Sequence, residues 1–226
     1  MTPTHPITED DIANFLIHTP AFFERHAELL TAVQLTSPHG NRAVSLQERQ
    51  AEMLREKIKG LERRIMDMIR HGNENMLIAD KLQRWARSLL RARAPAELPQ
   101  RIVAEVQAEF GVPQAALKVW HVAGEYAGHG FAQGVSEDAK SFASSLTAPF
   151  CGVNPGLEAV QWLPAPAEAM SVALMPLRTG GPGGAEPAFG MLVLASPDPA
   201  RFESGMGTDF LERIAELAGA ALSRLQ

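Results

Sequence analysis

The sequence predicts an α+β fold, in which an antiparallel sheet carries helices on one face and follows a long coiled-coil helix and a short helical hairpin. Three patterns in the 226 residues support this prediction. Apolar residues recur at alternating steps of three and four from residue 44 to residue 89, as in a helix that packs against another helix. Two apolar segments, 171–178 and 188–196, have the length and composition of strands. Segments of helical periodicity flank these strands, an order typical of α+β domains.

Residues 1–43 form the first predicted part, a helical hairpin followed by a loop. Thr8 and Asp11 have the spacing of a capping box at a helix start, and Pro20 suits the first turn of a second helix. The pair of helices is too small to bury its aromatic side chains, which are Phe15, Phe22 and Phe23. We therefore expect the hairpin to dock on the long helix or on a second chain. The segment 34–43 contains proline, glycine and asparagine and is predicted as a loop.

Residues 44–72 are predicted to form a dimerisation helix that leads into the next domain. Ser45 and Glu48 make a second capping box where the heptads begin. Gly72 and Asn75 place small or polar groups on the seam, which indicates a local kink or a close approach of helices at Gly72, or alternatively a hinge or a device that fixes the register. We expect the apolar seam to face a second copy of the chain, parallel or antiparallel, through Leu54, Ile58, Leu61, Ile65, Met68 and Leu82.

Residues 73–226 are predicted to form the globular domain. Pro95 opens a helix of regular apolar spacing that Gly111 ends, and period-two alternation predicts a strand at 115–122. A short helix is expected at 137–147, and the proline-containing run 149–166 is expected to be irregular. The strands 171–178 and 188–196 are joined by a Gly/Pro-rich link at 179–187, which predicts a hairpin. An amphipathic helix at 207–225 completes the domain.

The composition favours a folded protein of the cytoplasm. At 46% hydrophobic the chain can fill a core, and no apolar run approaches the roughly 18 residues that span a bilayer. The polar, acidic start of the sequence lacks the apolar region of a secretory signal. The single cysteine, Cys151, excludes an internal disulfide framework and a multi-cysteine metal site within one chain. We therefore expect a cytoplasmic location and no association with a membrane.

The net charge of −5 conceals a basic segment. Residues 45–93 contain twelve Arg or Lys and seven Asp or Glu, so this segment carries +5 and the remainder carries −10. A basic helix beside an acidic domain can attract nucleic acid. The basic residues alternate with acids, however, and Trp85 is the one aromatic residue among them, too few to stack on successive bases. A solvated coiled-coil surface is therefore the favoured interpretation, and no nucleic-acid partner is expected.

Two resemblances cover the chain. Residues from about 73 to 225 resemble a GAF domain, a small sensory fold related to PAS domains, in AALKVW, SVALMPLR and AFGMLVLASPDPARF followed by the terminal helix. The whole chain resembles a bacterial family of unknown function, numbered four-eight-four, in TPAFFERHAELL, VSLQERQAEMLREKIKGLE, NENMLIADKLQRWARSLL and APFCG. The resemblance implies a cytoplasmic, GAF-like protein that forms dimers, and it transfers no catalytic residues.

No motif for a known chemistry is found. The seven histidines lack metal-ligand spacing, and neither a nucleotide-phosphate loop nor a GxSxG elbow is present, so we expect no metal and identify no cofactor. Cys151 is the residue with reactive potential, although a free cysteine more often serves as a small apolar side chain. The sulfoxide reductases of GAF type need several cysteines, and the cyclic-nucleotide motif of GAF domains is not found.

A ligand pocket is the remaining expectation. In GAF-like folds the irregular insert caps one face of the sheet and leaves a cavity. Aromatic side chains with one cation suit an apolar or weakly anionic molecule, and the same aromatics can equally serve as core. The leading hypothesis is a non-enzymatic sensor or regulatory protein that dimerises through the long helix. Its alternatives are an interaction scaffold without a ligand and an enzyme dependent on Cys151. The candidate pocket residues are Trp120, Phe150, Cys151, Trp162 and Arg178.

Overall fold

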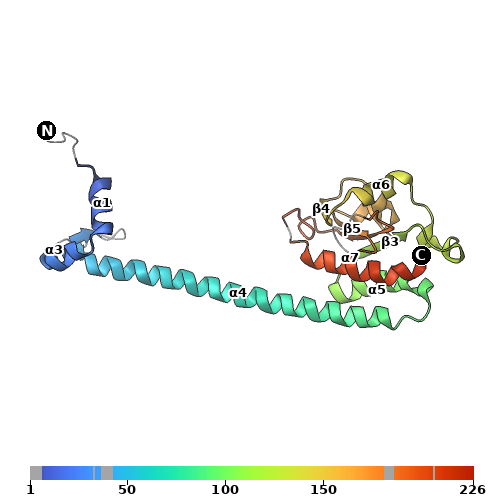
Figure 1. Ribbon diagram of the computed structural model, residues 1–226, viewed down its shortest axis with the longest axis horizontal. Helices are drawn as coiled ribbons and strands as arrows, with labels where there is room; N and C mark the ends of the chain where they lie inside the picture. The colour runs from blue at the N-terminus through green and yellow to red at the C-terminus, as the bar shows by residue number, and fades with distance from the viewer. Residues whose placement is uncertain (1–6, 33, 37–42, 181–185, 206) are drawn as a thin grey trace. The chain divides into compact units, whose positions relative to one another are not determined.

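The structure, a computed structural model, describes residues 7–32, 34–36, 43–180, 186–205 and 207–226 (Figure 1). The chain divides into two compact units, Met1–Asn73 and Glu74–Gln226. The helix α4, Leu46–Leu90, contributes to both units.

The first unit begins with three short helices, α1 (Glu9–His18), α2 (Ala21–Arg25) and α3 (Ala27–Ala32). The predicted capping box is confirmed, because the Thr8 hydroxyl accepts from the Asp11 amide at 3.2 Å and the Asp11 carboxylate accepts from the Thr8 amide at 2.9 Å. Phe22 stacks edge-on against Phe15, with ring centroids 5.8 Å apart. The helices therefore cover part of their aromatic surface with each other.

The segment predicted as a loop contains a short antiparallel ladder. Strands β1 (Gln34–Thr36) and β2 (Ala43–Ser45) pair with each other. The prediction was wrong for these residues, because three-residue strands are too short to show a period-two pattern. The central part of the predicted loop, 37–42, lies outside the described residues.

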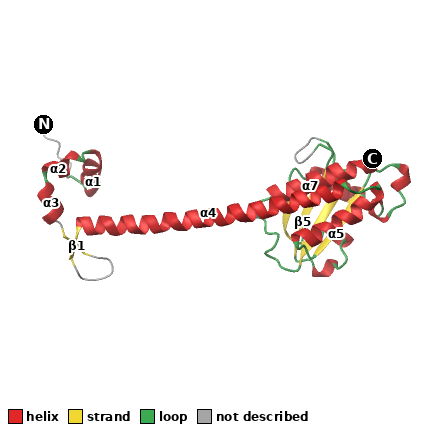
Figure 2. Cartoon of the chain, turned by 90° about the horizontal axis from the view of Figure 1, so that it is seen from below, coloured by secondary structure: helices red, strands yellow, loops and turns green. Residues whose placement is uncertain are grey.

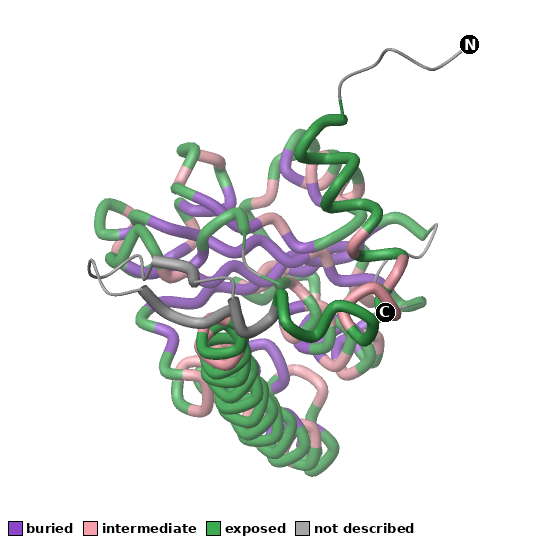
Figure 3. Tube along the Cα trace, turned by 90° about the vertical axis from the view of Figure 1, so that its left-hand side faces the viewer, coloured by how far each residue is buried: buried purple, intermediate pink, exposed green. Residues whose placement is uncertain are grey.

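The long helix α4 continues through both of its glycines. Gly60 and Gly72 are helical, and a Cβ added at either position would meet no atom within 4 Å. In Figure 3 most of α4 is coloured as exposed. The boundary between the two units falls between Asn73 and Glu74, one residue beyond Gly72.

The second unit is built on a four-stranded antiparallel sheet with the order β3-β6-β5-β4. Its strands are β3 (Gln114–Val119), β4 (Phe150–Val153), β5 (Ser171–Leu177) and β6 (Gly190–Ser196). Strands β5 and β6 are neighbours and pair antiparallel, as predicted for the hairpin. Residues 181–185 of the link between them lie outside the described residues. Strand β4 was missed, because four residues that include Gly152 give no strand signal within the run predicted as irregular.

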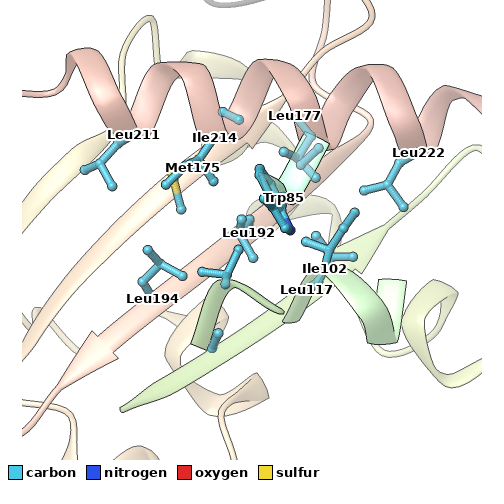
Figure 4. Packing of buried hydrophobic residues seen from close by; sticks show 14 of the residues in the cluster. Trp85, Ile102, Leu117, Met175, Leu177, Leu192, Leu194, Leu211, Ile214 and Leu222 are labelled. Atoms are coloured by element: carbon cyan, nitrogen blue, oxygen red, sulfur yellow. The ribbon is translucent and has the colours of Figure 1, made fainter. Parts of the chain in front are cut away.

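One face of the sheet is covered by helices α5 (Leu98–Phe110), α7 (Asp209–Leu222) and the last turns of α4 (Figure 2). Trp85 of α4 is only 1% exposed in this core and meets Phe110 edge-on, with ring centroids 6.3 Å apart. Figure 4 shows the leucine and isoleucine side chains of α7 pointing towards the strands. We call this layer the proximal core; its large, fully buried members include Trp85, Leu98, Ile102, Met175, Leu177, Leu192, Leu194, Leu222 and Leu225.

The opposite face is covered by helix α6 (Glu137–Ser145) and the 3-10 helix η4 (Glu158–Trp162). The α+β class and the antiparallel sheet are thus confirmed, while helical elements lie on both faces rather than on one. We call this second layer the distal core; its buried members include Ala116, Trp120, Ala143, Val160, Leu163, Val172, Leu174, Met191 and Val193. Further 3-10 turns are Pro95–Glu97, Gly124–Tyr126, Gly130–Ala132, Pro166–Glu168 and Ser223–Leu225.

Candidate functional site

A cavity of about 340 Å³ lies on the distal face of the sheet, between α6, η4 and strand β6. Its volume falls at the lower end of the range usual for small-molecule sites. The residues that line it are Asp138, Ala139, Phe142, Leu157, Glu158, Ala159 and Met191. We call it the distal cavity.

The residue Ser136 joins two walls of the distal cavity. Its hydroxyl caps α6 by accepting from the Ala139 amide at 3.1 Å, as expected of a serine before a helix. Its amide donates to Glu158 Oε1 at 3.0 Å, and its hydroxyl donates to Glu158 Oε2. These hydrogen bonds lower the pKa of Glu158 below its ordinary value, so the carboxylate is charged at neutral pH.

The distal cavity is apolar inside and acidic at its rim. Met191 is completely buried, and Phe142 and Leu157 are half-buried. The carboxyl groups of Asp138 and Glu158 are exposed. An apolar interior with carboxylates at its mouth suits a neutral or positively charged molecule with an apolar body.

The three predicted aromatic residues pack together in the distal core, although none of them is among the residues that line the cavity. Trp120 is 4% exposed, and its indole N–H donates to the Ala188 carbonyl at 2.7 Å. Phe150 and Trp162 pack against the same cluster. The indole nitrogen of Trp162 is buried and finds no hydrogen-bond partner within the described part of the chain. These side chains therefore belong to the distal core and do not line the cavity.

Cys151 and Arg178 lie apart from this group. Cys151 is 9% exposed and packs in the proximal core, on the other side of the sheet, where burial raises the pKa of its thiol. The Arg178 guanidinium donates to the carbonyls of Ser144 at 3.0 Å, Leu146 at 2.7 Å and Glu186. Arg178 thus ties the end of β5 to the end of α6. The cation that was expected to favour a weakly anionic molecule is thus hydrogen-bonded to main-chain oxygens.

Sequence reasoning missed the residues that do line the cavity, although two patterns pointed to them. Ala139, Phe142 and Ala143 follow helical spacing within the predicted helix at 137–147. Alternation along β6 places Met191 on the same face as Val193. These patterns identify the face of each residue, but not where the facing layer leaves a gap.

The residues predicted for the dimer interface fall into two groups. Those within 54–68 are between 48% and 71% exposed, whereas Leu82 is 6% exposed and packs in the proximal core. Leu82 is therefore already covered by its own domain. The exposed members of the predicted seam are Leu54, Ile58, Leu61, Ile65 and Met68.

The described residues offer neither a cluster of metal ligands nor a membrane-spanning helix. No three His, Cys, Asp or Glu side chains among them are grouped closely enough to hold a metal ion. None of the helices in this part of the chain combines the length and the apolar character needed to cross a bilayer.

Comparison with known proteins gives one family and several distant structural likenesses. The family described as "Protein of unknown function, DUF484" matches residues 1–226. No curated protein matches. Among solved structures, a GAF domain assigned to a sensor histidine kinase of Pseudomonas syringae pv. tomato is 20% identical, with a TM-score of 0.43 over 69% of this chain and 91% of that one.

Two further solved structures have similar scores. The GAF domain of the potassium sensor histidine kinase KdpD from Escherichia coli is 14% identical, with a TM-score of 0.40 over 65% of this chain and 94% of that one. The free methionine-R-sulfoxide reductase of Neisseria meningitidis is 12% identical, with a TM-score of 0.43 over 65% of this chain and 88% of that one. Likenesses this distant transfer neither a ligand nor an activity.

Proposed function

The chain belongs along its whole length to the DUF484 family, and we propose that it is a non-enzymatic regulatory protein of the cytoplasm that binds a small molecule and forms dimers. In this proposal the GAF-like domain, residues 73–226, takes the molecule into the distal cavity. The segment 44–72, which is helical from Leu46 onwards, joins two chains, and residues 1–43 form a separate N-terminal part.

The observation that carries the ligand proposal is the hollow in an otherwise filled distal layer. Met191, Val193 and Val172 are completely buried beneath this layer, so the sheet itself is well packed. The hollow opens to the surface, and apolar clefts of this size are usual sites for small molecules. A cavity of about 340 Å³ with apolar walls and two rim carboxylates is consistent with a neutral or cationic ligand.

The dimer proposal is supported by the exposed seam. Leu61 is 48% exposed and Ile65 is 54% exposed, and they lie four residues apart on one face of α4. Each such side chain contributes about 1 kcal/mol to an interface when its exposed half leaves water. The five exposed seam residues in each chain would together supply several kcal/mol, which is the usual driving force of a coiled coil.

Strand β6 offers a route from the distal cavity to α4. Met191 lines the cavity, while its neighbour Leu192 points to the opposite face and packs in the proximal core with Trp85. A ligand that displaces Met191 would therefore act on the packing of Trp85 through one strand. Packed cores transmit such shifts because they are stiff. The proposed response is a change in the packing at the end of α4.

Native mass spectrometry of protein purified from its own host tests the ligand proposal. Ala139→Leu places extra volume in the cavity, and Ser141→Leu places the same side chain on the exposed face of the same helix. We expect a bound small molecule in the wild-type protein and in Ser141→Leu, and its loss in Ala139→Leu. A wild-type protein without any bound mass, or an Ala139→Leu variant that keeps it, would contradict the proposal.

An interaction scaffold is the second candidate, and the exposed apolar surface of α1 favours it. Phe15 is 52% exposed, Ile12 is 50% exposed and Ile17 is 73% exposed. Such a concentration on one short helix suggests a docking site for a protein. Deletion of residues 1–43 should then abolish co-purification of partners. Recovery of the same partners by the truncated chain would count against a scaffold.

A further inference from the structure

A second surface of the GAF-like domain is basic rather than apolar. An open groove of about 770 Å³ runs between the end of α4 and the start of α5, on the proximal side of the sheet. Its lining residues are Arg84, Arg87, Ser88, Leu90, Arg91 and Arg101. We call it the arginine groove.

Helical spacing brings these cations together. Arg84 and Arg87 lie three residues apart on one face of the last turns of α4, and Arg91 follows four residues later, directly after the helix ends at Leu90. Arg101 comes from α5 on the other side. Four guanidinium groups thus converge on one groove.

The acids within reach neutralise only part of this charge. Arg84 pairs with Glu109 at 3.0 Å, and Arg101 lies 4.0 Å from Glu105. Arg87 and Arg91 are exposed, and their guanidinium groups make no hydrogen bond or ion pair with any residue that the structure describes. Holding like charges close together costs free energy that a negatively charged partner would offset.

The arginine groove adjoins an apolar one. Leu90 is 84% exposed and lines both the arginine groove and a smaller groove of about 190 Å³ between α4 and α7. The smaller groove is lined mostly by Ala86, Leu89 and three residues of α7. An occupant of the whole surface must therefore combine acidic groups with an apolar side chain. The α7 residues are Leu217, Ala220 and Ala221.

We propose that this surface docks an acidic amphipathic helix of a partner protein. Carboxylates at steps of three and four on such a helix match the spacing of Arg84, Arg87 and Arg91, and guanidinium groups bind carboxylates in a bidentate manner. An apolar side chain of the same helix fills the groove beside Leu90. The site is separate from the distal cavity and does not depend on a ligand there.

A protein fits this surface better than a nucleic acid does. No aromatic residue lines either groove among the described residues, so bases have nothing to stack on. The apolar groove offers no gain to a sugar-phosphate backbone.

Fluorescence anisotropy with a designed probe tests the proposal. The probe is a labelled helical peptide of about 14 residues, with glutamates at steps of three and four on one face and a leucine beside them. Its control replaces the glutamates by glutamine. We expect binding of the glutamate peptide, weakening with salt, and roughly tenfold weaker binding to Arg91→Glu. Arg213→Glu makes the same charge change at an exposed position outside both grooves and should leave affinity unchanged.

Thermal melting of both variants establishes that they fold. Equal binding of the glutamine peptide, or equal losses in Arg91→Glu and Arg213→Glu, would overturn the proposal. Duplex DNA that binds more tightly than the glutamate peptide and is lost in Arg91→Glu would also overturn it, in favour of a nucleic-acid partner.

Discussion

Replacement of Gly219 by alanine tests the close packing of α7 on the sheet. A Cβ at this position would lie 2.6 Å from the Arg178 carbonyl oxygen, about 0.8 Å closer than the 3.4 Å at which ordinary contact begins. The obstacle is main chain, so it cannot be relieved by a rotamer change. Overpacking of this kind costs about 1–3 kcal/mol, and the better helix propensity of alanine returns about 1 kcal/mol.

We therefore expect Gly219→Ala to destabilise the domain by up to about 2 kcal/mol, which corresponds to a Tm lower by roughly 4–8 °C for a domain of this size. Gly60→Ala is the matched control, because its Cβ would meet no atom within 4 Å and only the propensity gain remains. Differential scanning calorimetry measures both variants. A Gly219→Ala protein that melts at or above the wild-type temperature would refute the packing argument.

Gly219→Ala should also affect the distal face of the sheet. The shifted residue is Arg178, whose guanidinium donates to Ser144 and Leu146 at the end of α6. We expect faster hydrogen exchange at the amides of α6 in Gly219→Ala than in the wild-type protein. Unchanged exchange there would show that Arg178 does not couple the two faces.

Three further predictions concern single side chains. The hydrogen bonds from Ser136 lower the pKa of Glu158 in the folded protein below its ordinary value of 4.5. They therefore stabilise the fold fully at a pH above 4.5, and this stabilisation is lost as the pH falls through the pKa of the folded state. An NMR titration should show the pKa of Glu158 returning towards 4.5 in Ser136→Ala. Burial raises the pKa of the Cys151 thiol, so Ellman's reagent should react with it only after unfolding, and rapid reaction of the native protein would revive a role for this thiol. Trp120→Phe should lower stability by about 1–2 kcal/mol in urea unfolding, because the Ala188 carbonyl loses its buried donor.

Periodicity predicted most of the fold, because each long element presents a repeating apolar face. The helices at 137–147 and 207–225 and both central strands were placed within a few residues. The ladder of β1 with β2 and the edge strand β4 were missed, since strands of three or four residues carry too little pattern. Leu82 continues the heptad spacing, but α4 has a wider apolar surface after Asn75, and this part of the helix is buried in the core of the domain.

The candidate site was harder to predict, because a cavity is a gap between layers and not a residue type. Trp120 and Trp162 drew attention as aromatics in or near the insert, but they fill space on the distal face. The lining residues Phe142, Leu157 and Met191 come from three separate segments, and only the folded chain brings them together. Arg178 was predicted as a ligand-binding cation from its residue type. Its guanidinium donates to main-chain carbonyls, and such partners cannot be recognised in a sequence.

Sedimentation equilibrium of the full chain tests the central claim most directly. The chain has a mass of 24.5 kDa. We predict a dimer of twice this mass for the wild-type protein and a monomer for the double variant Leu61→Glu/Ile65→Glu. The control Met53→Glu/Met66→Glu changes two exposed methionines of α4 that lie beside the seam and should stay dimeric. A monomeric wild-type protein, or a Leu61→Glu/Ile65→Glu variant that remains a dimer, would contradict the account.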